Sequence, residues 1–230
     1  MKAVSLRSLA LATLASLAMA TSSSAVTVLQ YAQQNPNDVV TATASGAQTT
    51  LSVTNQLIFI NNLAGAQVSP PGPAVLTIAA TSSGAATTTV GTIEQLFSGT
   101  ITIRNVANTQ NILTTTFTNA VLSGLAGGGS VSLVGSRPPG GVLFSSDSPA
   151  IQALIAGDPP ENFAISFSNL SNPLAVVGGT VASFTAQNTG TFATGTTAVI
   201  PEPSSIVMAG MAMIAGLGGL GWRRRQSSRA

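Results

Sequence analysis

Acidic side chains are the only potentially catalytic groups that gather in one part of this sequence. Asp147, Asp158 and Glu161 lie close together. Glycoside hydrolysis needs two carboxyl groups at a set separation, and a loop around Asp158 and Glu161 could offer oxygens to calcium, which takes about six to eight of them. A solvated turn is the simpler interpretation, because Asp beside two prolines is common turn chemistry. We therefore assign no metal site and keep Asp158 and Glu161 only as candidate ligands.

The residue types that are missing exclude much other chemistry. The 230-residue chain has no His and no Cys, which excludes Ser-His-Asp triads, cysteine nucleophiles, disulfides and His or Cys zinc sites. The Gly-rich segments carry neither a P-loop lysine nor a dinucleotide fingerprint. One Trp and one Tyr leave few aromatic platforms for sugar stacking. We predict that the protein is not an enzyme and uses no cofactor.

Charged residues are rare and lie mostly at the two ends of the chain. The sequence has 8 basic and 6 acidic residues, and its pI is about 9.9. All but Arg104 and Arg137 of the basic residues lie in the first seven or the last eight positions. Two separated arginines form no basic stripe, so we expect no nucleic-acid partner.

Residues 26–200 are predicted to form one all-β domain. Large apolar residues alternate with polar ones at the period of a strand, so that Phe163, Ile165 and Phe167 would share one face. Gly- and Pro-rich turn segments separate such runs. Many short strands with such turns favour a sandwich or a barrel, and we predict a single jelly-roll-like β-sandwich. A disordered Ser/Thr-rich stalk is the alternative, above all for residues 26–95.

One short helix is predicted over residues 148–156. Ser148 suits the N-cap, Pro149 suits the first helical position, and Gly157 suits the end of the helix. The apolar side chains at helical spacing would then face the sheet, namely Ile151, Leu154 and Ile155.

The first 25 residues are typical of a secretory signal. Two basic residues lie within residues 1–7, an apolar run covers residues 8–19, and small residues follow. The run is shorter than the roughly 20 residues of a membrane-spanning helix. We predict a signal helix that engages the Sec export machinery and is cleaved after Ala20 or Ala25.

The last part of the chain is predicted to anchor it in a membrane. Residues 204–222 carry no charge, and a helix of that length, rising about 1.5 Å per residue, matches the hydrocarbon core of about 30 Å. Arg223, Arg224 and Arg225 follow directly, and positive charge stays on the cytoplasmic side. We therefore predict a transmembrane helix with the middle of the chain outside the inner membrane.

Pro201, Glu202 and Pro203 stand directly before this span. The order of Pro-Glu-Pro, apolar span and arginine cluster resembles the PEP-CTERM sorting signal of bacterial surface proteins, over residues 201–230. The resemblance implies an exosortase as partner, a membrane-embedded transpeptidase-like enzyme that cuts near the motif and releases or transfers the protein outward. Extracellular polysaccharide and biofilm matrix are the usual setting. A plain Pro-rich stop before a permanent anchor is the alternative.

These features predict three parts: a signal peptide over residues 1–25, a β-sandwich domain over 26–200 and a sorting segment over 201–230. We expect an exported protein, held briefly in the inner membrane and then placed at the cell surface or outside the cell. A structural or interaction role beside extracellular polysaccharide is the main expectation. A calcium-dependent or carbohydrate-binding β-sandwich module with the same sorting is the alternative.

Overall fold

The structure, a computed structural model, describes residues 25–63, 72–137, 140–157 and 160–195. Ala25 is the first described residue. Within these ranges, no helix has the length and apolar character that crossing a membrane requires. Several predictions concern residues outside the described ranges: Ala20, Pro201, Glu202, Pro203, the span 204–222, Arg223, Arg224, Arg225 and Asp158.

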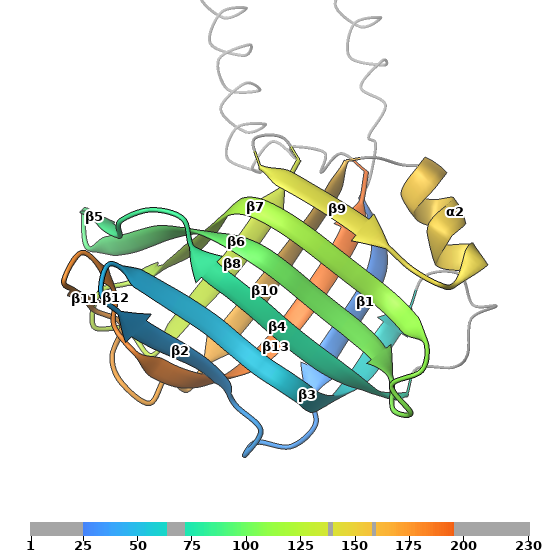
Figure 1. Ribbon diagram of the computed structural model, residues 1–230, viewed down its shortest axis with the longest axis horizontal. Helices are drawn as coiled ribbons and strands as arrows, with labels where there is room; N and C mark the ends of the chain where they lie inside the picture. Colours follow the sequence, from blue (N-terminus) through green and yellow to red (C-terminus); the bar gives the residue numbers. More distant parts are fainter. Residues whose placement is uncertain (1–24, 64–71, 138–139, 158–159, 196–230) are drawn as a thin grey trace, which may run out of the picture. The chain divides into compact units, whose positions relative to one another are not determined.

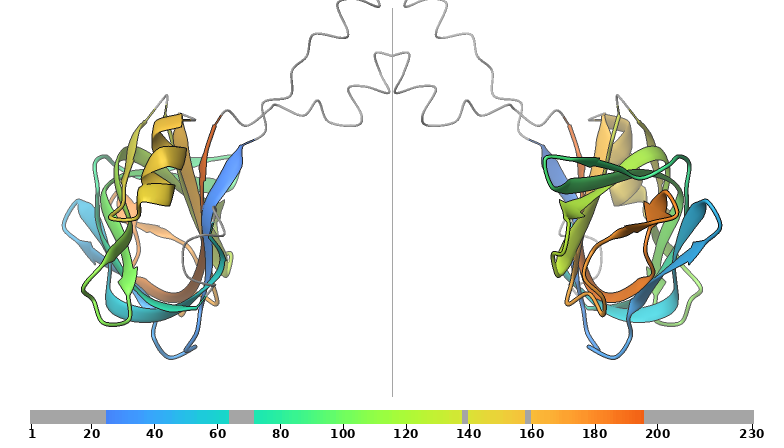
Figure 2. Two further views of the ribbon diagram at one scale, coloured as in Figure 1. Left: turned by 90° about the vertical axis from the view of Figure 1, so that its right-hand side faces the viewer. Right: turned by 90° about the vertical axis from the view of Figure 1, so that its left-hand side faces the viewer.

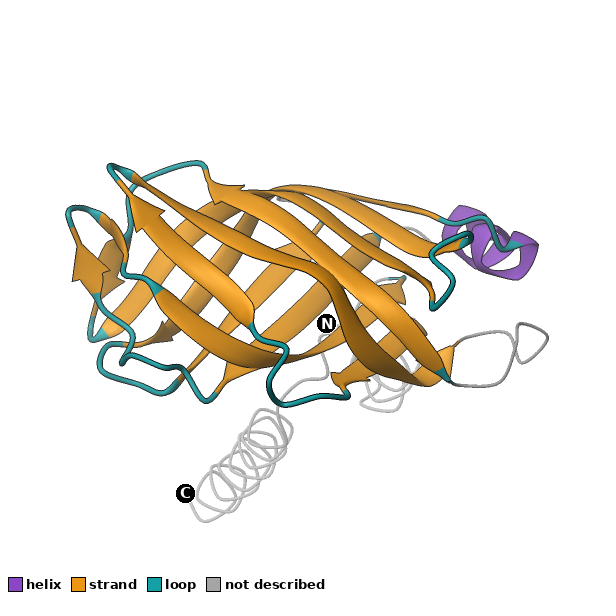
Figure 3. Ribbon diagram, turned by 60° about the horizontal axis from the view of Figure 1, so that its bottom comes forward, coloured by secondary structure: helices purple, strands orange, loops and turns teal. Residues whose placement is uncertain are grey.

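The described chain is almost entirely β-structure, as predicted (Figure 1; Figure 3). Strands occupy much of residues 26–95, where a disordered stalk was the alternative. In chain order the elements are β1 (Val26–Gln33), β2 (Val40–Ser45), β3 (Gln48–Leu63), β4 (Pro73–Ser82), β5 (Thr87–Thr89), β6 (Thr92–Asn105), β7 (Asn111–Leu125), β8 (Ser130–Ser136), β9 (Gly141–Ser145), α2 (Pro149–Gly157), β10 (Glu161–Ser168), β11 (Val176–Val177), β12 (Thr180–Val181) and β13 (Phe184–Thr194).

The main sheet closes on itself, so the prediction of a β-sandwich is wrong. Successive neighbours run β1, β3, β4, β6, β7, β8, β10, β13 and back to β1, and every pair is antiparallel. The result is an eight-stranded up-and-down barrel. Alternating apolar residues give each strand one buried face in a sandwich and in a barrel alike. Only the strand pairing separates the two architectures, and the sequence does not display it.

At two of the eight places around the barrel wall, two consecutive strands of the chain share one place instead of a single strand. β1 and β2 both lie between β3 and β13. In the same way, β8 and β9 both pair with β7. Figure 2 views the ring of strands from its two ends, with α2 at one end and the hairpin β11–β12 at the other.

The core of the barrel is its interior, which apolar side chains from every strand of the wall fill. Phe163, Ile165 and Phe167 of β10 are each no more than 2% exposed, and their predicted shared face is the inner one. Four rings form a continuous stack across four strands. Their order is Tyr31, Phe192, Phe163 and Phe117, with centroids 6.3, 6.0 and 5.0 Å apart. These spacings are typical of favourable aromatic contacts.

Two glycines make room for this stack. Gly190 lies directly opposite Tyr31 in the β1–β13 pairing, and Gly135 lies directly opposite Phe163 in the β8–β10 pairing. A Cβ at Gly190 would lie 2.3 Å from a ring carbon of Tyr31, and a Cβ at Gly135 would lie 2.3 Å from one of Phe163. Each ring therefore lies over a position where only glycine fits.

The helix occurs where the sequence predicts it. α2 begins at Pro149, immediately after Ser148, and ends at Gly157. Ile151 is fully buried, and Ile155 packs against the core as a partly buried residue. The backbone N–H of Gln152 donates to the carbonyl of Ser148 at 2.9 Å, which is the first turn of the helix. Ile151 and Ile155 of the predicted apolar face therefore meet the barrel, whereas Leu154 is half-buried and is not among the residues packed on the core.

Candidate functional site

Glu161, one of the two candidate metal ligands, lies at the start of β10 and faces the barrel interior. Its side chain is 8% exposed, and its Oε2 has no hydrogen-bond partner among the described residues. The nearest charge is the guanidinium of Arg137, whose Nη1 lies 3.9 Å from that oxygen. A cation beside the carboxylate already balances its charge, and this opposes a metal ion at the same place.

Asp147 is the other acid of the predicted cluster that the structure describes, and it has a partner of its own. Asp147 lies before α2, where its Oδ2 accepts the backbone N–H of Asn111 at 2.8 Å and so joins two loops. Asp158 lies outside the described ranges. Across the residues that the structure describes, no group of three or more acidic, His or Cys side chains could hold a metal. Asp147 and Glu161 thus bind different partners, and the described residues do not bring the predicted cluster together as a metal site.

Tyr31 is one of the aromatic rings packed in the interior of the barrel. Tyr31 is 1% exposed, and burial raises the pKa of its phenol far above the ordinary value of tyrosine. Its hydroxyl has no hydrogen-bond partner. Gly190 and the ring of Phe192 enclose it from two sides. A phenol held neutral and unpaired in this way acts as packing volume and not as an acid or base.

A buried polar network holds the hairpin β11–β12 at one end of the barrel. Thr180 of the hairpin shares a 2.5 Å hydroxyl contact with Thr49, whose hydroxyl also donates to the carbonyl of Val181 at 2.7 Å. The amide of Gln95 donates to Thr180 at 2.9 Å and accepts the backbone N–H of Val181 at 3.1 Å. Every named polar group in this network has a partner, which indicates a structural closure of the barrel.

A second polar network leaves one acceptor unpaired. The Oε1 of Gln33 accepts the backbone N–H of Asn188 at 2.9 Å, and the side-chain amide of Asn188 donates to Gln56 at 2.7 Å. Asn188 is 1% exposed, and its Oδ1 has no partner among the described residues. Buried acceptors without a partner are uncommon and often mark the place of a water molecule or a ligand group.

The outer wall of the barrel carries hydroxyl side chains aligned across the strands. On one row, Thr116 pairs with Thr100, and Ser52 pairs with Thr41, which pairs with Thr185. Ala79 completes this row between Thr100 and Ser52. Other rows are formed by Ser98, Thr81, Thr50 and Thr43; by Ser145, Thr114, Thr102 and Thr77; and by Ser123, Ser132, Ser166 and Thr189.

These rows were not predicted, although the sequence does predict Thr on outward strand positions. Neighbouring strands lie about 4.8 Å apart, and alternate residues along a strand lie about 6.8 Å apart, which sets the spacing of the hydroxyls. The alignment depends on the register between strands that are far apart in the chain, such as Thr41 and Thr185. No periodicity within one segment could have shown it.

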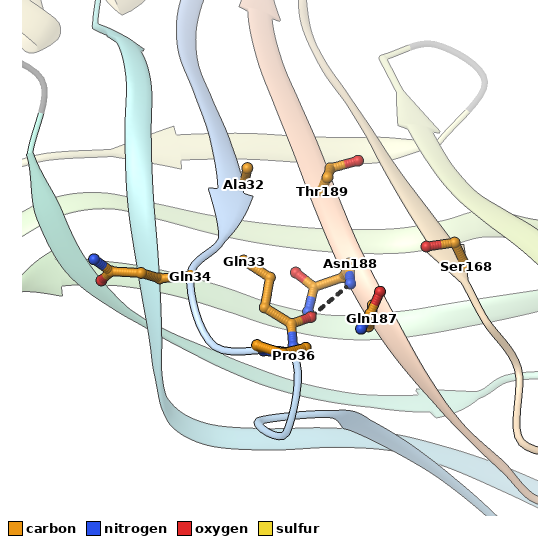
Figure 4. Close-up of a pocket in the computed structure, with 8 residues that line it drawn as sticks. All are labelled: Ala32, Gln33, Gln34, Pro36, Ser168, Gln187, Asn188 and Thr189. Atoms are coloured by element: carbon orange, nitrogen blue, oxygen red, sulfur yellow. Dashed lines mark hydrogen bonds between the residues drawn. The ribbon is translucent and has the colours of Figure 1, made fainter.

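Two pockets lie next to each other on the wall that contains β10. The serine pocket, of about 440 Å³, is lined by Ser123, Ser130, Ser132, Ser166, Ser168 and Leu125, together with backbone of the same strands. The amide pocket, of about 170 Å³, is lined by Ser168, Gln33, Gln187, Asn188, Thr189 and Pro36, with two neighbours (Figure 4). Ser168 lines both pockets, and no charged residue lines either.

The fold and these sites define a closed antiparallel barrel with packed aromatic rings in its interior and rows of hydroxyl side chains on its outer wall. No protein-family model, curated protein or solved structure matches the chain.

Proposed function

We propose that this chain is an exported, non-catalytic protein of the cell surface or the extracellular matrix, with a structural or interaction role beside extracellular polysaccharide. In this proposal an exosortase-type enzyme reads Pro201, Glu202 and Pro203 and removes the tail after the Sec machinery has exported the chain. The inner membrane holds the protein only until that step.

The rows of hydroxyl side chains on the outer wall are the observation that carries the role. Four rows of Ser and Thr cross the barrel, and only Ala79 interrupts them. Hydroxyl groups both donate and accept hydrogen bonds, so such a wall is compatible with the hydrated, hydroxyl-rich surroundings of a polysaccharide.

The closure of the barrel supports the proposed removal of both terminal segments. β1 begins at Val26 and pairs with β13, which ends at Thr194. The barrel is therefore complete without any residue before Val26 or after Thr194. Cleavage after Ala20 or Ala25, and again near Pro201, would leave the core unchanged.

Cell fractionation tests this proposal. Wild-type protein and the Glu202→Ala variant are expressed in cells with and without the exosortase. The matched control is Glu94→Ala, which makes the same change at an exposed position of β6. We expect wild type and Glu94→Ala in the extracellular fraction, and Glu202→Ala, or wild type without the enzyme, in the inner membrane. Normal release of Glu202→Ala would show that the motif is not read.

Of the alternative functions, the calcium-dependent module gains no support from the described residues, because Arg137 faces Glu161 and no ligand group of three is present among them. The carbohydrate-binding alternative is favoured by a specific observation, the pair of neutral pockets joined at Ser168.

A further inference from the structure

We infer that the serine pocket and the amide pocket together form one groove that binds a neutral polysaccharide chain. This inference rests on the proposed function and names its partner and its site. The groove crosses the wall from β7 through β8, β10 and β13 to β1. Because neighbouring strands lie about 4.8 Å apart, the length of the groove across these strands is about 19 Å.

The register of the strands makes the groove continuous. Ser123, Ser132, Ser166 and Thr189 are direct partners in successive pairings, so their hydroxyls follow one line across four strands. A second line lies two residues away and consists of Ser130, Ser168 and Gln187. Both lines run from the serine pocket into the amide pocket.

Several hydroxyls along the groove are available to a ligand, whereas the hydroxyl of Ser132 donates to the carbonyl of Ser123 at 3.4 Å. Among the described residues, the hydroxyls of Ser166, Ser168 and Thr189 make no hydrogen bond with another protein group, and all three residues are exposed. Gln187 uses its Oε1 to accept from Asn169 at 2.7 Å, which leaves its amide N–H groups to donate elsewhere. Asn188 also lines the amide pocket, but its side chain is buried on the opposite face of β13 from Gln187 and Thr189, so its unpaired Oδ1 is not one of these available groups.

The chemistry of the lining selects the ligand class. No lysine or arginine is present to bind phosphate, sulfate or uronate groups, and no carboxylate is present to bind a cation. Hydroxyls and carboxamides each donate and accept, which matches the hydroxyls of a neutral sugar. Leu125, 67% exposed, adds an apolar contact for the C–H face of a ring.

The groove lacks an exposed aromatic ring, so each binding event is weak. Retention in a matrix then depends on many copies that engage a long chain at once, because linked sites bind far more tightly than single ones. A method that detects weak binding to a polymer is therefore required.

Affinity electrophoresis of the full chain in mild detergent provides that method, and it does not depend on sorting. Native gels contain dextran, hydroxyethyl cellulose or the neutral polysaccharide fraction from the producing cells, and parallel gels contain alginate as a polyanion. The groove variant is Ser166→Val with Ser168→Val, which keeps a good strand residue at both positions. The matched control is Thr87→Val with Thr89→Val on β5, two exposed threonines that belong to none of the hydroxyl rows and line neither pocket.

We expect at least one neutral polysaccharide to retard the wild type and the control, and the groove variant to bind about tenfold more weakly. The Thr189→Val variant should weaken binding as well, and unchanged melting temperatures show that all variants fold. Lack of retardation by every neutral polysaccharide, stronger retardation by alginate, or equal losses in the groove variant and the control would each overturn the inference. A negative binding result would not change the result of the fractionation experiment on Glu202→Ala. Likewise, a negative fractionation result would not change the result of the electrophoresis.

Discussion

Replacing Gly190 by alanine tests the packing of the barrel interior most sharply. The new Cβ would lie 2.3 Å from Cε1, 2.8 Å from Cζ and 3.0 Å from the hydroxyl of Tyr31. These atoms cannot move aside easily, because Tyr31 is 1% exposed and its ring contacts that of Phe192. Overpacking of a filled core typically costs about 1–3 kcal/mol, and a clash with a fixed ring falls at the upper end.

We therefore expect Gly190→Ala to lower the free energy of unfolding by about 3 kcal/mol. For a domain of this size the melting temperature falls by about 2–4 °C per kcal/mol, so the expected decrease is about 6–12 °C. Urea unfolding followed by circular dichroism measures the free energy, and a thermal scan measures the melting temperature. The control is Gly84→Ala, where an added Cβ meets no atom within 4 Å.

A double-mutant cycle identifies the cause of the destabilisation. In a Tyr31→Leu background the ring is absent, so Gly190→Ala should cost at least about 1 kcal/mol less than in the wild type. Equal costs in both backgrounds, or a Gly190→Ala variant that melts within about 1 °C of wild type, would refute the argument that the ring occupies the space over the glycine.

Three further predictions concern groups that the structure places in or near the core. Burial raises the pKa of the Tyr31 phenol, so the stabilising contribution of Tyr31 is complete below about pH 10, the ordinary pKa of tyrosine, and declines above that pH. Because Tyr31 is the sole Tyr, phenolate absorbance should appear only when the protein unfolds. Reversible appearance of that absorbance near pH 10 in folded protein would contradict the burial of the ring. Gln95→Leu removes the acceptor of the Val181 N–H. It should lower the free energy of unfolding by about 2–3 kcal/mol and speed hydrogen exchange at the Val181 amide. Continued protection of that amide from exchange would show that the network does not close the barrel. Glu161→Gln should lower the free energy of unfolding by less than about 1 kcal/mol, because the partner Arg137 is 53% exposed. Millimolar calcium should leave the melting temperature of the wild type unchanged. If calcium raised the melting temperature of the wild type but not of Glu161→Gln, the metal site would be restored.

The local features of the fold could be predicted because they depend on short segments. Alternation along β10 identifies its buried face, and Ser148, Pro149 and Gly157 mark the ends of α2. These signals depend on residues within a few positions of each other, whose geometry is fixed by the local backbone.

The closed barrel and the groove could not be predicted because they depend on pairings between distant segments. The contact of β1 with β13 joins Val26 to Thr194, and it decides between a barrel and a sandwich. The groove likewise needs Ser123, Ser132, Ser166 and Thr189 in one register. Each segment contributes only one or two hydroxyls, which in isolation are ordinary outward residues of a strand.

For the acidic residues, the sequence suggested a shared site that the described fold does not form. The suggestion came from the closeness of Asp147 and Glu161 in the sequence. Asp147 and Glu161 flank α2, and each has a separate partner: Asn111 for the first and Arg137 for the second. Asp147 lies in the loop before α2 and Glu161 lies at the start of β10, so sequence proximity alone was a poor guide to a shared site.

The intact mass of the protein recovered from the extracellular fraction tests the central claim most directly. We predict a chain that begins after Ala20 or Ala25 and ends near Pro201, Glu202 and Pro203, without Arg223, Arg224 and Arg225. An extracellular protein that still extends from Met1 to Ala230 would contradict the claim that both ends are removed from a self-sufficient barrel.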